Sequence, residues 1–395
     1  MLDHDIIRPS TSSWSSPCVL VPKPDGSVRF CTDYRKLNTV TKTDVYPIPR
    51  IDDCIDRVGD ARYLSKIDLL KGYWCVPLTE RGREVSAFVC SAGLFEYNVM
   101  PFGMKNAPAT FQRMMEKVLS GLSHSYAYID DVVIRSDTWE EHVDNIREVL
   151  CRLADARLTV NLAKSEFACA KVSYLGYQIG QGQLAPVEAK VKAILDFAPP
   201  TDKKGVRRFL GMIGYYRKFC KNFAQLAIPL TGLLRKDGRF NWTDECKEAF
   251  ERLKHILCHH PVLKMPDFNA SFELAIDASD QAAGGVLLQT DGKTESIKHP
   301  IAYFSRKFDK HQQNYSTIEK ELLALILAVQ HFEVYISRVK LLKVYTDHNP
   351  LVFLKRMKNR NRRLLNWSLL LQEYNLDIHH IKGTDNVIAD ALSRC

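Results

Sequence analysis

SYAYIDDVVI, residues 125–134, places two carboxylates between two apolar, β-prone runs. This pattern predicts a β-hairpin with Asp130 and Asp131 at its tip. Adjacent like charges repel one another there unless a cation binds them. An isolated Asp-Asp pair in a turn is more often simply solvated, because aspartate favours turns. The surrounding sequence therefore has to decide between a solvated turn and a metal site.

A second β-prone run upstream also ends in a carboxylate. It is YLSKIDLLKGYW, residues 63–74, which reaches Asp68. Three carboxylates at neighbouring strand ends would supply the hard oxygen ligands that Mg²⁺ prefers. Phosphoryl transfer by two metal ions needs this arrangement, because one ion activates the attacking hydroxyl and the other neutralises the triphosphate and its leaving group.

The segment VMPFGMKNAPATFQ, residues 99–112, lies between these acids. The order of the three segments resembles the palm of the reverse transcriptases of gypsy-type long-terminal-repeat retrotransposons. The resemblance implies that Asp68 and Asp130 are the main metal ligands and that Asp131 assists them. It also implies that the backbone carbonyl of Leu69 is a further ligand.

The same resemblance implies a set of residues that contact the incoming nucleotide. Tyr73 matches the bulky sugar gate, whose ring would clash with a 2′-hydroxyl, so a preference for deoxynucleotides is expected. Lys23 and Arg29 flank a Pro-Asp-Gly turn in a predicted hairpin and match the fingers residues that contact the triphosphate. Phe102 and Gly103 match the lining of the nucleotide pocket. For Phe102 the alternative is a buried core aromatic.

A second set of acids comes from four separate elements near the C-terminus. Asp277 ends an apolar β run, Glu319 is near the start of a long helix, Asp347 ends KVYTD, and Asp390 lies in NVIADALSR. Gathered like charges destabilise a fold unless divalent cations bind them. Glu321 is a rival on the same helix, but the two glutamates lie about 200° apart at 3.6 residues per turn, so one of them can face the site.

The strings around these acids resemble the ribonuclease H of retrotransposons. They are IDASDQAAGGVLLQ, YSTIEKELLA, YTDHNPL and IKGTDNVIADALSR. This pattern selects Glu319 over Glu321. It implies a second two-metal site that cuts RNA in a hybrid with DNA, with selectivity from the 2′-hydroxyl. The histidine-bearing loop of cellular ribonucleases H is replaced by KGTDN, so base assistance from that loop is not expected.

The resemblance covers nearly the whole chain and implies its fold class. We expect an α+β right-hand polymerase with fingers, palm and a helical thumb or connection, followed by an α/β ribonuclease-H-like domain. The predicted boundaries are 1–180 for fingers and palm, 181–267 for the helical thumb or connection, and 268–395 for the ribonuclease-H-like domain. Both ends look clipped relative to the family.

Composition agrees with a nucleic-acid partner without requiring one. The 395 residues carry 55 basic against 46 acidic side chains, a net charge of +9. No apolar run reaches the roughly 20 residues of a membrane span, and no signal peptide is apparent, so we expect an intracellular, cytoplasmic or particle-associated protein. The 11 cysteines show no metal-binding spacing and are expected to be reduced thiols.

The expected ligands follow from the resemblance. They are an RNA template, a DNA primer, an RNA/DNA hybrid, deoxynucleoside triphosphates and two Mg²⁺ ions per active site, with Mn²⁺ as the alternative. No membrane is expected, and the oligomeric state stays open. The basic run at residues 355–363 is the predicted hybrid-binding strip. The alternative function is a non-catalytic nucleic-acid-binding remnant of a decayed or truncated element.

Overall fold

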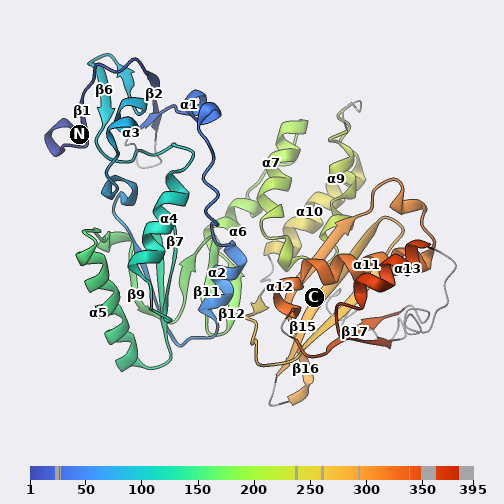
Figure 1. Ribbon diagram of the computed structural model, residues 1–395. Coiled ribbons are helices and arrows are strands. Elements are labelled where there is room, and N and C mark those ends of the chain that lie inside the picture. The colour runs from blue at the N-terminus through green and yellow to red at the C-terminus, as the bar shows by residue number, and fades with distance from the viewer. Residues whose placement is uncertain are drawn as a thin grey trace. The chain divides into compact units, whose positions relative to one another are not determined.

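The computed structural model describes most of the chain, with gaps. It covers residues 1–22, 26, 28–235, 239–258, 262–291, 294–337, 339–347 and 362–381. The chain forms two compact units (Figure 1). The first unit consists of residues 1–175 with 179–181, and the second of residues 176–178 with 182–395. The predicted helical and ribonuclease-H-like segments thus share a unit, and the three-part division stays a prediction.

The first unit alternates short strands with helices. Its strands, together with β11 at the boundary, are β1 (Ile7–Pro9), β2 (Ser16–Pro22), β3 (Val28–Thr32), β4 (Tyr63–Asp68), β5 (Phe88–Cys90), β6 (Gly93–Tyr97), β7 (Ser125–Tyr128), β8 (Asp131–Ser136), β9 (Glu166–Cys169), β10 (Val172–Tyr174) and β11 (Tyr177–Gly180). Its helices are η1 (Leu2–His4), α1 (Arg35–Val40), α2 (Ile51–Val58), η2 (Gly72–Cys75), α3 (Glu80–Val85), α4 (Ala107–Val118), α5 (Trp139–Asp155) and η3 (Leu162–Lys164).

Two sheets organise this unit. One has the order β1–β6–β5–β2–β3 and the other the order β7–β8–β4–β9. Helices α4 and α5 pack on the second sheet, where Phe111 and Met115 of α4 and Val149 of α5 share a core with Val132 and Ile134 of β8. Val132 and Ile134 are two residues apart on β8 and therefore lie on the same face of the strand, the face that meets the helices. The core fixes the sheet that carries the first set of acids.

The second unit contains a helical segment and a mixed sheet. Its strands are β12 (Gln183–Pro186), β13 (Leu263–Lys264), β14 (Phe272–Ala278), β15 (Ala282–Asp291), β16 (Thr294–Lys307), β17 (Leu342–Thr346) and β18 (Leu376–His380). Its helices are α6 (Glu188–Leu195), α7 (Lys203–Gly214), η4 (Arg217–Phe219), α8 (Phe223–Leu226), α9 (Ile228–Gly232), α10 (Asp244–Cys258), η5 (Gln312–Asn314), α11 (Thr317–His331), α12 (Glu333–Ile336) and α13 (Arg362–Leu371).

The mixed sheet has the order β16–β15–β14–β17–β18. β14 pairs antiparallel with β15 and parallel with β17. Helix α11 packs on β14 and β15, as Figure 1 shows, and is buried along most of its length. β14 is buried along its first five residues, and the buried carboxylate among them, Glu273, is paired with Lys298 at 2.5 Å.

These features confirm the expected fold class, an α+β polymerase part followed by an α/β ribonuclease-H-like part. β7–β8 and β2–β3 are the two predicted hairpins. β14 corresponds to the predicted β run that reaches Asp277, and α11 corresponds to the predicted long helix that carries Glu319. Among the described residues, no helix is long and apolar enough to cross a membrane.

Candidate active sites

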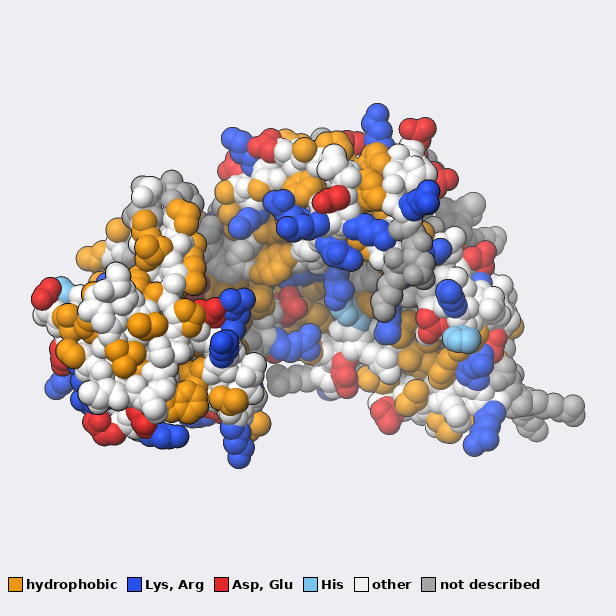
Figure 2. All heavy atoms as spheres, turned by 90° about the horizontal axis from the view of Figure 1, so that it is seen from above, with side chains coloured by type: hydrophobic (Ala, Val, Ile, Leu, Met, Phe, Trp, Pro, Cys, Tyr) orange, Lys and Arg blue, Asp and Glu red, His pale blue; other side chains and the backbone are white. Residues whose placement is uncertain are grey.

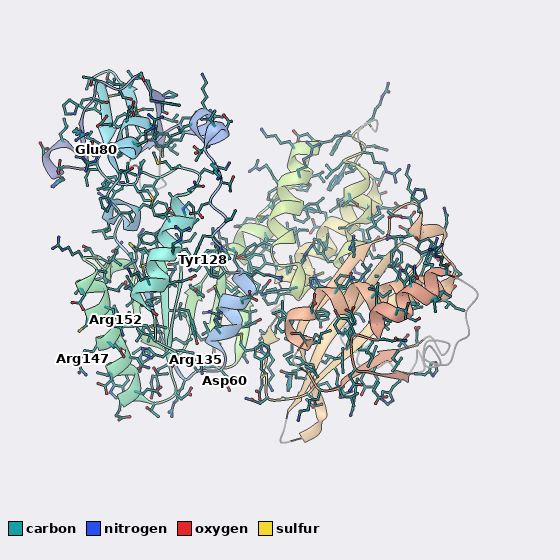
Figure 3. All side chains as sticks on the ribbon, viewed as in Figure 1. Asp60, Glu80, Tyr128, Arg135, Arg147 and Arg152 are labelled. Atoms are coloured by element: carbon teal, nitrogen blue, oxygen red, sulfur yellow. The ribbon has the colours of Figure 1, made fainter. Side chains whose placement is uncertain are left out.

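The first set of acids meets at one end of the β7–β8–β4 sheet. Asp68, the last residue of β4, is paired in register with Asp131, the first residue of β8. Tyr128 pairs with Asp131, so Ile129 and Asp130 form the two-residue turn between them. Figure 3 labels Tyr128 at the upper end of this sheet, which marks the hairpin tip. The sequence-predicted trio is therefore brought together.

A buried glutamine clamps this turn. Gln112 of α4 is fully buried and accepts a hydrogen bond from the backbone N–H of Ile129 at 2.7 Å. Its side-chain amide donates to the carbonyl of Ala127 at 3.0 Å. Ile129 has a positive φ of 56°, which a β-branched residue adopts only when its surroundings impose it. Gln112 was not singled out from the sequence, although a glutamine on the apolar face of an amphipathic helix is a usable signal.

The three aspartates interact electrostatically with one another. Partial burial raises the pKa of Asp131 above its usual range, and the charges of Asp130 and Asp68 raise it further. Lys66 acts in the opposite direction through an ion pair with Asp131 at 3.3 Å. One ammonium group facing three carboxylates leaves net negative charge at this strand end. Such a site favours a bound cation.

The residues matched to the nucleotide pocket lie beside these acids. The ring of Tyr73 in η2 is 4.9 Å from the ring of Phe102 and contacts Phe111 edge-on. Burial raises the pKa of Tyr73 to about 12, and the charge of Asp130 adds to the effect. Phe102 is 49% exposed, so it is not the buried core aromatic that was the alternative. Gly103 has a φ of 94°, which explains a glycine there.

Two other predicted contacts belong to the hairpin that the sequence predicts around the Pro-Asp-Gly turn. Lys23 lies outside the described residues. Arg29 belongs to β3, where it pairs with Val21, but its side chain is not described. Both roles stay predictions.

The second set of acids converges at the ends of two parallel strands. β14 and β17 pair with an offset of 70 residues, as in Glu273 with Lys343. Continuing that offset places Asp277 opposite Asp347, which directly follows β17. The pKa of Asp277 is raised by partial desolvation and by the charge of Asp347. Parallel strands end at the same sheet edge, which explains why two acids far apart in sequence meet there.

The third acid of this cluster is Glu321, not Glu319. Glu321 is 5% exposed, and one of its carboxylate oxygens has no hydrogen-bond partner among the described residues. Burial raises its pKa to about 8, with further contributions from the charges of Asp347 and Asp277. The glutamate that faces the acids is thus the one that the sequence pattern rejected.

Glu319 has a different structural role. It forms a capping box with Ser316 at the start of α11, and its carboxylate pairs with Arg363 at 3.0 Å. These contacts hold the carboxylate at the helix N-terminus. The prediction that Glu319 faces the second site is therefore corrected. Asp390, the fourth predicted acid, lies outside the described residues.

Comparisons with known proteins identify two families along the chain. Residues 21–179 match the family model described as "Reverse transcriptase (RNA-dependent DNA polymerase)", and residues 267–374 match "RNase H-like domain found in reverse transcriptase". The whole chain is 42% identical to the Pol polyprotein from transposon 297 of Drosophila melanogaster and covers 37% of that protein. It is 37% identical to the transposon Tf2-3 polyprotein of Schizosaccharomyces pombe and covers 30% of it.

This chain belongs to the reverse transcriptase and ribonuclease H region of retrotransposon Pol polyproteins. It spans about a third of the length of these curated relatives. Its fold is similar to the foamy viral protease-reverse transcriptase dRH solved with double-stranded DNA, with a TM-score of 0.87, 23% identity and coverage of 96% of this chain and 68% of the other. The same viral enzyme solved with an RNA/DNA hybrid gives a TM-score of 0.79 at 23% identity, with coverage of 97% and 52%.

Families of these two kinds use divalent metal ions. Among the described residues, no three metal-ligating side chains already surround a single point. The donor chemistry nevertheless fits a hard cation, because each cluster presents several carboxylates, and their negative charges contribute to the raised pKa of Asp131 in one cluster and of Glu321 in the other. The unpartnered oxygen of buried Glu321 is the strongest sign, since a buried carboxylate without a partner is costly.

Histidines near the second site make local hydrogen bonds. His380 contacts the backbone carbonyl of Asp347 at 3.1 Å, and His379 pairs with Asp377 at 2.8 Å. Both contacts suit a positioning role better than a catalytic base. His348 lies outside the described residues.

An aromatic stretch at residues 215–223 largely packs in the second unit. Tyr216 and Phe219 are buried, whereas Tyr215 is partly exposed. The hydroxyl of Tyr216 donates to the carbonyl of Gly176 at 2.9 Å. A side chain at Gly176 would crowd the ring of Tyr215, at 3.2 Å from the added carbon.

Proposed function

We propose that this reverse transcriptase region is an RNA-directed DNA polymerase that copies retrotransposon RNA into DNA. We further propose that its second cluster of acids hydrolyses the RNA strand of RNA/DNA hybrids. The observation that supports both is the presence of two separate groups of neighbouring carboxylates, one around Asp131 and one around Glu321. The partners would be an RNA template, a DNA primer and deoxynucleoside triphosphates.

In the polymerase site, Asp68, Asp130 and Asp131 would hold two Mg²⁺ ions, with the Leu69 carbonyl as a further ligand. When bound, the ions supply activation of the primer hydroxyl and charge neutralisation at the phosphates. Side chains of the protein position the metal ligands and the nucleotide. Gln112 holds the turn that carries Asp130, and the ring of Tyr73 bounds the space for the nucleotide sugar.

In the hydrolytic site, Asp277, Glu321 and Asp347 would hold the ions, with Asp390 as the proposed fourth ligand. Glu321 sits on the rigid helix α11, and the two aspartates sit at the ends of paired strands. Rigid elements fix the spacing of ligands better than loops do. The negative charge of the cluster also favours the binding of a divalent cation.

Two substitutions separate the sites. Asp130→Asn should abolish primer extension and spare hybrid cleavage, and Asp347→Asn should do the reverse, because each removes one ligand charge from one cluster. Asp137→Asn, at an exposed aspartate just after β8, is the matched control and should keep both activities. Loss of both activities from either site variant, with the fold intact, would refute the assignment of two independent sites. A wild-type chain that binds hybrid but performs neither reaction would favour the non-catalytic remnant.

A further inference from the structure

Two cysteines occupy matching positions on neighbouring strands of the first unit. β2 and β5 run parallel, and Pro17 of β2 is paired with Val89 of β5. The next residue on each strand is a cysteine, so the same register places Cys18 opposite Cys90. Neighbouring strands lie roughly 4.8 Å apart. That spacing falls within the range of about 4.4 to 6.8 Å that separates the Cα atoms of bridged cysteines.

Both cysteine side chains point to the inner face of this sheet. Side chains alternate between the two faces of a strand, and Phe88, two residues before Cys90, is buried. Cys18 and Cys90 both pack against the small cluster formed by Ile7, Phe88 and Tyr97. Each thiol is partly exposed and free. A small oxidant can therefore reach the pair.

Electrostatics agree with this placement. Burial raises the pKa of the Cys18 thiol, and the charge of Cys90 raises it further. Such an interaction weakens with distance, so it indicates that the two sulfur atoms are neighbours. A raised pKa also slows the attack of Cys18 on an oxidant, because the thiolate is the reactive form. We therefore assign the first attack to Cys90 and the second to Cys18.

Cys31 on the neighbouring strand β3 provides an internal comparison. A cysteine can serve simply as a small apolar residue in a core. Cys31 is also partly exposed, but it is paired with Val19, the residue next to Cys18. Its side chain therefore points to the opposite face of the sheet from Cys18. Register and face together distinguish the pair of Cys18 and Cys90 from this third thiol.

The position of the pair would give a bond between the two strands a structural effect. β2 continues past Cys18 into the β2–β3 hairpin, where Val19, Leu20 and Val21 are exposed. Figure 2 looks down on the end of the first unit that carries β2 in Figure 1, and it shows hydrophobic side chains spread over this face. Packing thus holds β2 less firmly beyond Cys18. A bond to Cys90 would fix the base of the hairpin to β5.

We propose that Cys18 and Cys90 form a reversible disulfide when the protein meets an oxidant of the hydroperoxide class. With hydrogen peroxide, the Cys90 thiolate attacks one oxygen and the O–O bond breaks. Cys90 becomes a sulfenic acid, and the departing hydroxide takes up a proton and leaves as water. The Cys18 thiolate then attacks the sulfenic sulfur, so that the S–S bond forms, the S–O bond breaks and a second water leaves. Two thiols are oxidised and one peroxide is reduced.

A dithiol reverses the bond by thiol–disulfide exchange and is itself oxidised. In a reducing compartment such a bond is transient and lasts while the oxidant is present. The bond joins residues that are far apart in the sequence, so it restricts the unfolded chain and stabilises the folded first unit. The inference is independent of the proposed function, because neither set of acids takes part.

The test treats the reduced full chain with hydrogen peroxide, alkylates the remaining thiols and searches a non-reducing digest by mass spectrometry. We expect a peptide that links Cys18 to Cys90 and that disappears after treatment with a dithiol. The urea midpoint of the oxidised protein should exceed that of the reduced protein by roughly 0.5 M or more. The dithiol should reverse this shift.

Three variants sharpen the result. Cys18→Ser and Cys90→Ser should each abolish the linked peptide and the midpoint shift, with the partner thiol recovered in other forms. Cys31→Ser is the matched control on the opposite face and should keep both. Cys18 and Cys90 alkylated as free thiols after oxidation, or bridged to other cysteines, would overturn the inference. A linked peptide that forms only in urea, or one that lowers the midpoint, would also overturn it, because the bond would then not fit the native register.

Discussion

The carboxyl group of Glu321 lies buried beside Asp277 and Asp347, so it must be neutralised by a proton or by a cation. Without a metal ion, the proton is retained to a higher pH than in a solvated glutamate. With a divalent cation, the ionised form is favoured instead. If the proposed function holds, Glu321 would couple metal binding to stability as well as to catalysis.

Substitutions can distinguish the roles of the two glutamates of α11. Glu321→Gln should reduce hybrid cleavage by roughly a hundredfold or more, because it removes a ligand charge, and should leave primer extension intact. Glu319→Gln is the matched control and should preserve cleavage, with a stability loss of at most about 1 kcal/mol from the weakened cap. The measurement is kcat for both reactions on each variant. Cleavage that survives Glu321→Gln but not Glu319→Gln would restore the original assignment.

The pH dependence of stability follows from the same carboxyl group. Its folded pKa, about 8, exceeds its ordinary value of 4.5, so between these values the folded state keeps a proton that the unfolded state has released. The free energy of unfolding of the metal-free chain should thus fall as pH rises from about 4.5 to about 8, by an amount on the order of a few kcal/mol. Urea unfolding in a chelator at several pH values measures it.

Two changes should remove most of the decrease in the free energy of unfolding with rising pH. Glu321→Gln has no proton to lose, and saturating Mg²⁺ stabilises the ionised form. Asp277 and Asp131, whose pKa values are raised as well, contribute a smaller fall of the same sign. If the glutamine variant loses stability with pH as steeply as the parent, Glu321 is not the group responsible.

At this scale the sequence could identify the type of residue but not always the right one. The acids at strand ends followed from the alternation of apolar residues and from the family pattern. The choice between Glu319 and Glu321 depended on helix rotation, which two residues on one turn leave open. The string Ser316-Thr-Ile-Glu319 is itself a capping-box signature, and this local signal pointed to a structural role for Glu319.

The hairpin β7–β8 is the element on which the polymerase site depends. Its turn contains a residue with positive φ and is held from α4 by one buried side chain, Gln112. The sequence of the turn alone does not stabilise this geometry. The positive φ of Ile129 costs conformational free energy, which contacts from outside the hairpin have to offset. The hairpin was predictable from the sequence. The contact of Gln112 with its turn was not, because that contact depends on how α4 packs against the hairpin.

Removing the clamp should affect one activity more than the other. Gln112→Leu keeps the volume but leaves the Ile129 N–H and the Ala127 carbonyl without partners, at a cost of about 1–3 kcal/mol each. We expect kcat for primer extension to fall at least roughly tenfold, because a small displacement of Asp130 disturbs the alignment of the reacting groups. Hybrid cleavage by the same protein is the internal control. Equal loss of both activities would mean that the substitution acts through unfolding.

At the scale of the whole molecule, the chain divides into two compact units that each carry one acid cluster. Effects of substitutions in separate units should add, since residues that share no partners rarely couple. The fold class, both hairpins and the order of the acids were predictable from local pattern and family resemblance. The packing of the 217–224 segment on β16 was not, because it depends on contacts between residues about 80 positions apart, such as Ala224 with Ser305.

The most direct test of two independent active sites uses the wild-type chain, Mg²⁺ and deoxynucleotides with a DNA primer on an end-labelled RNA template. Primer length and RNA length are followed in the same tube. We predict extended primer together with shortened RNA, both lost on chelation and restored by Mg²⁺. Intact RNA and unextended primer, bound by a folded protein, would contradict this account.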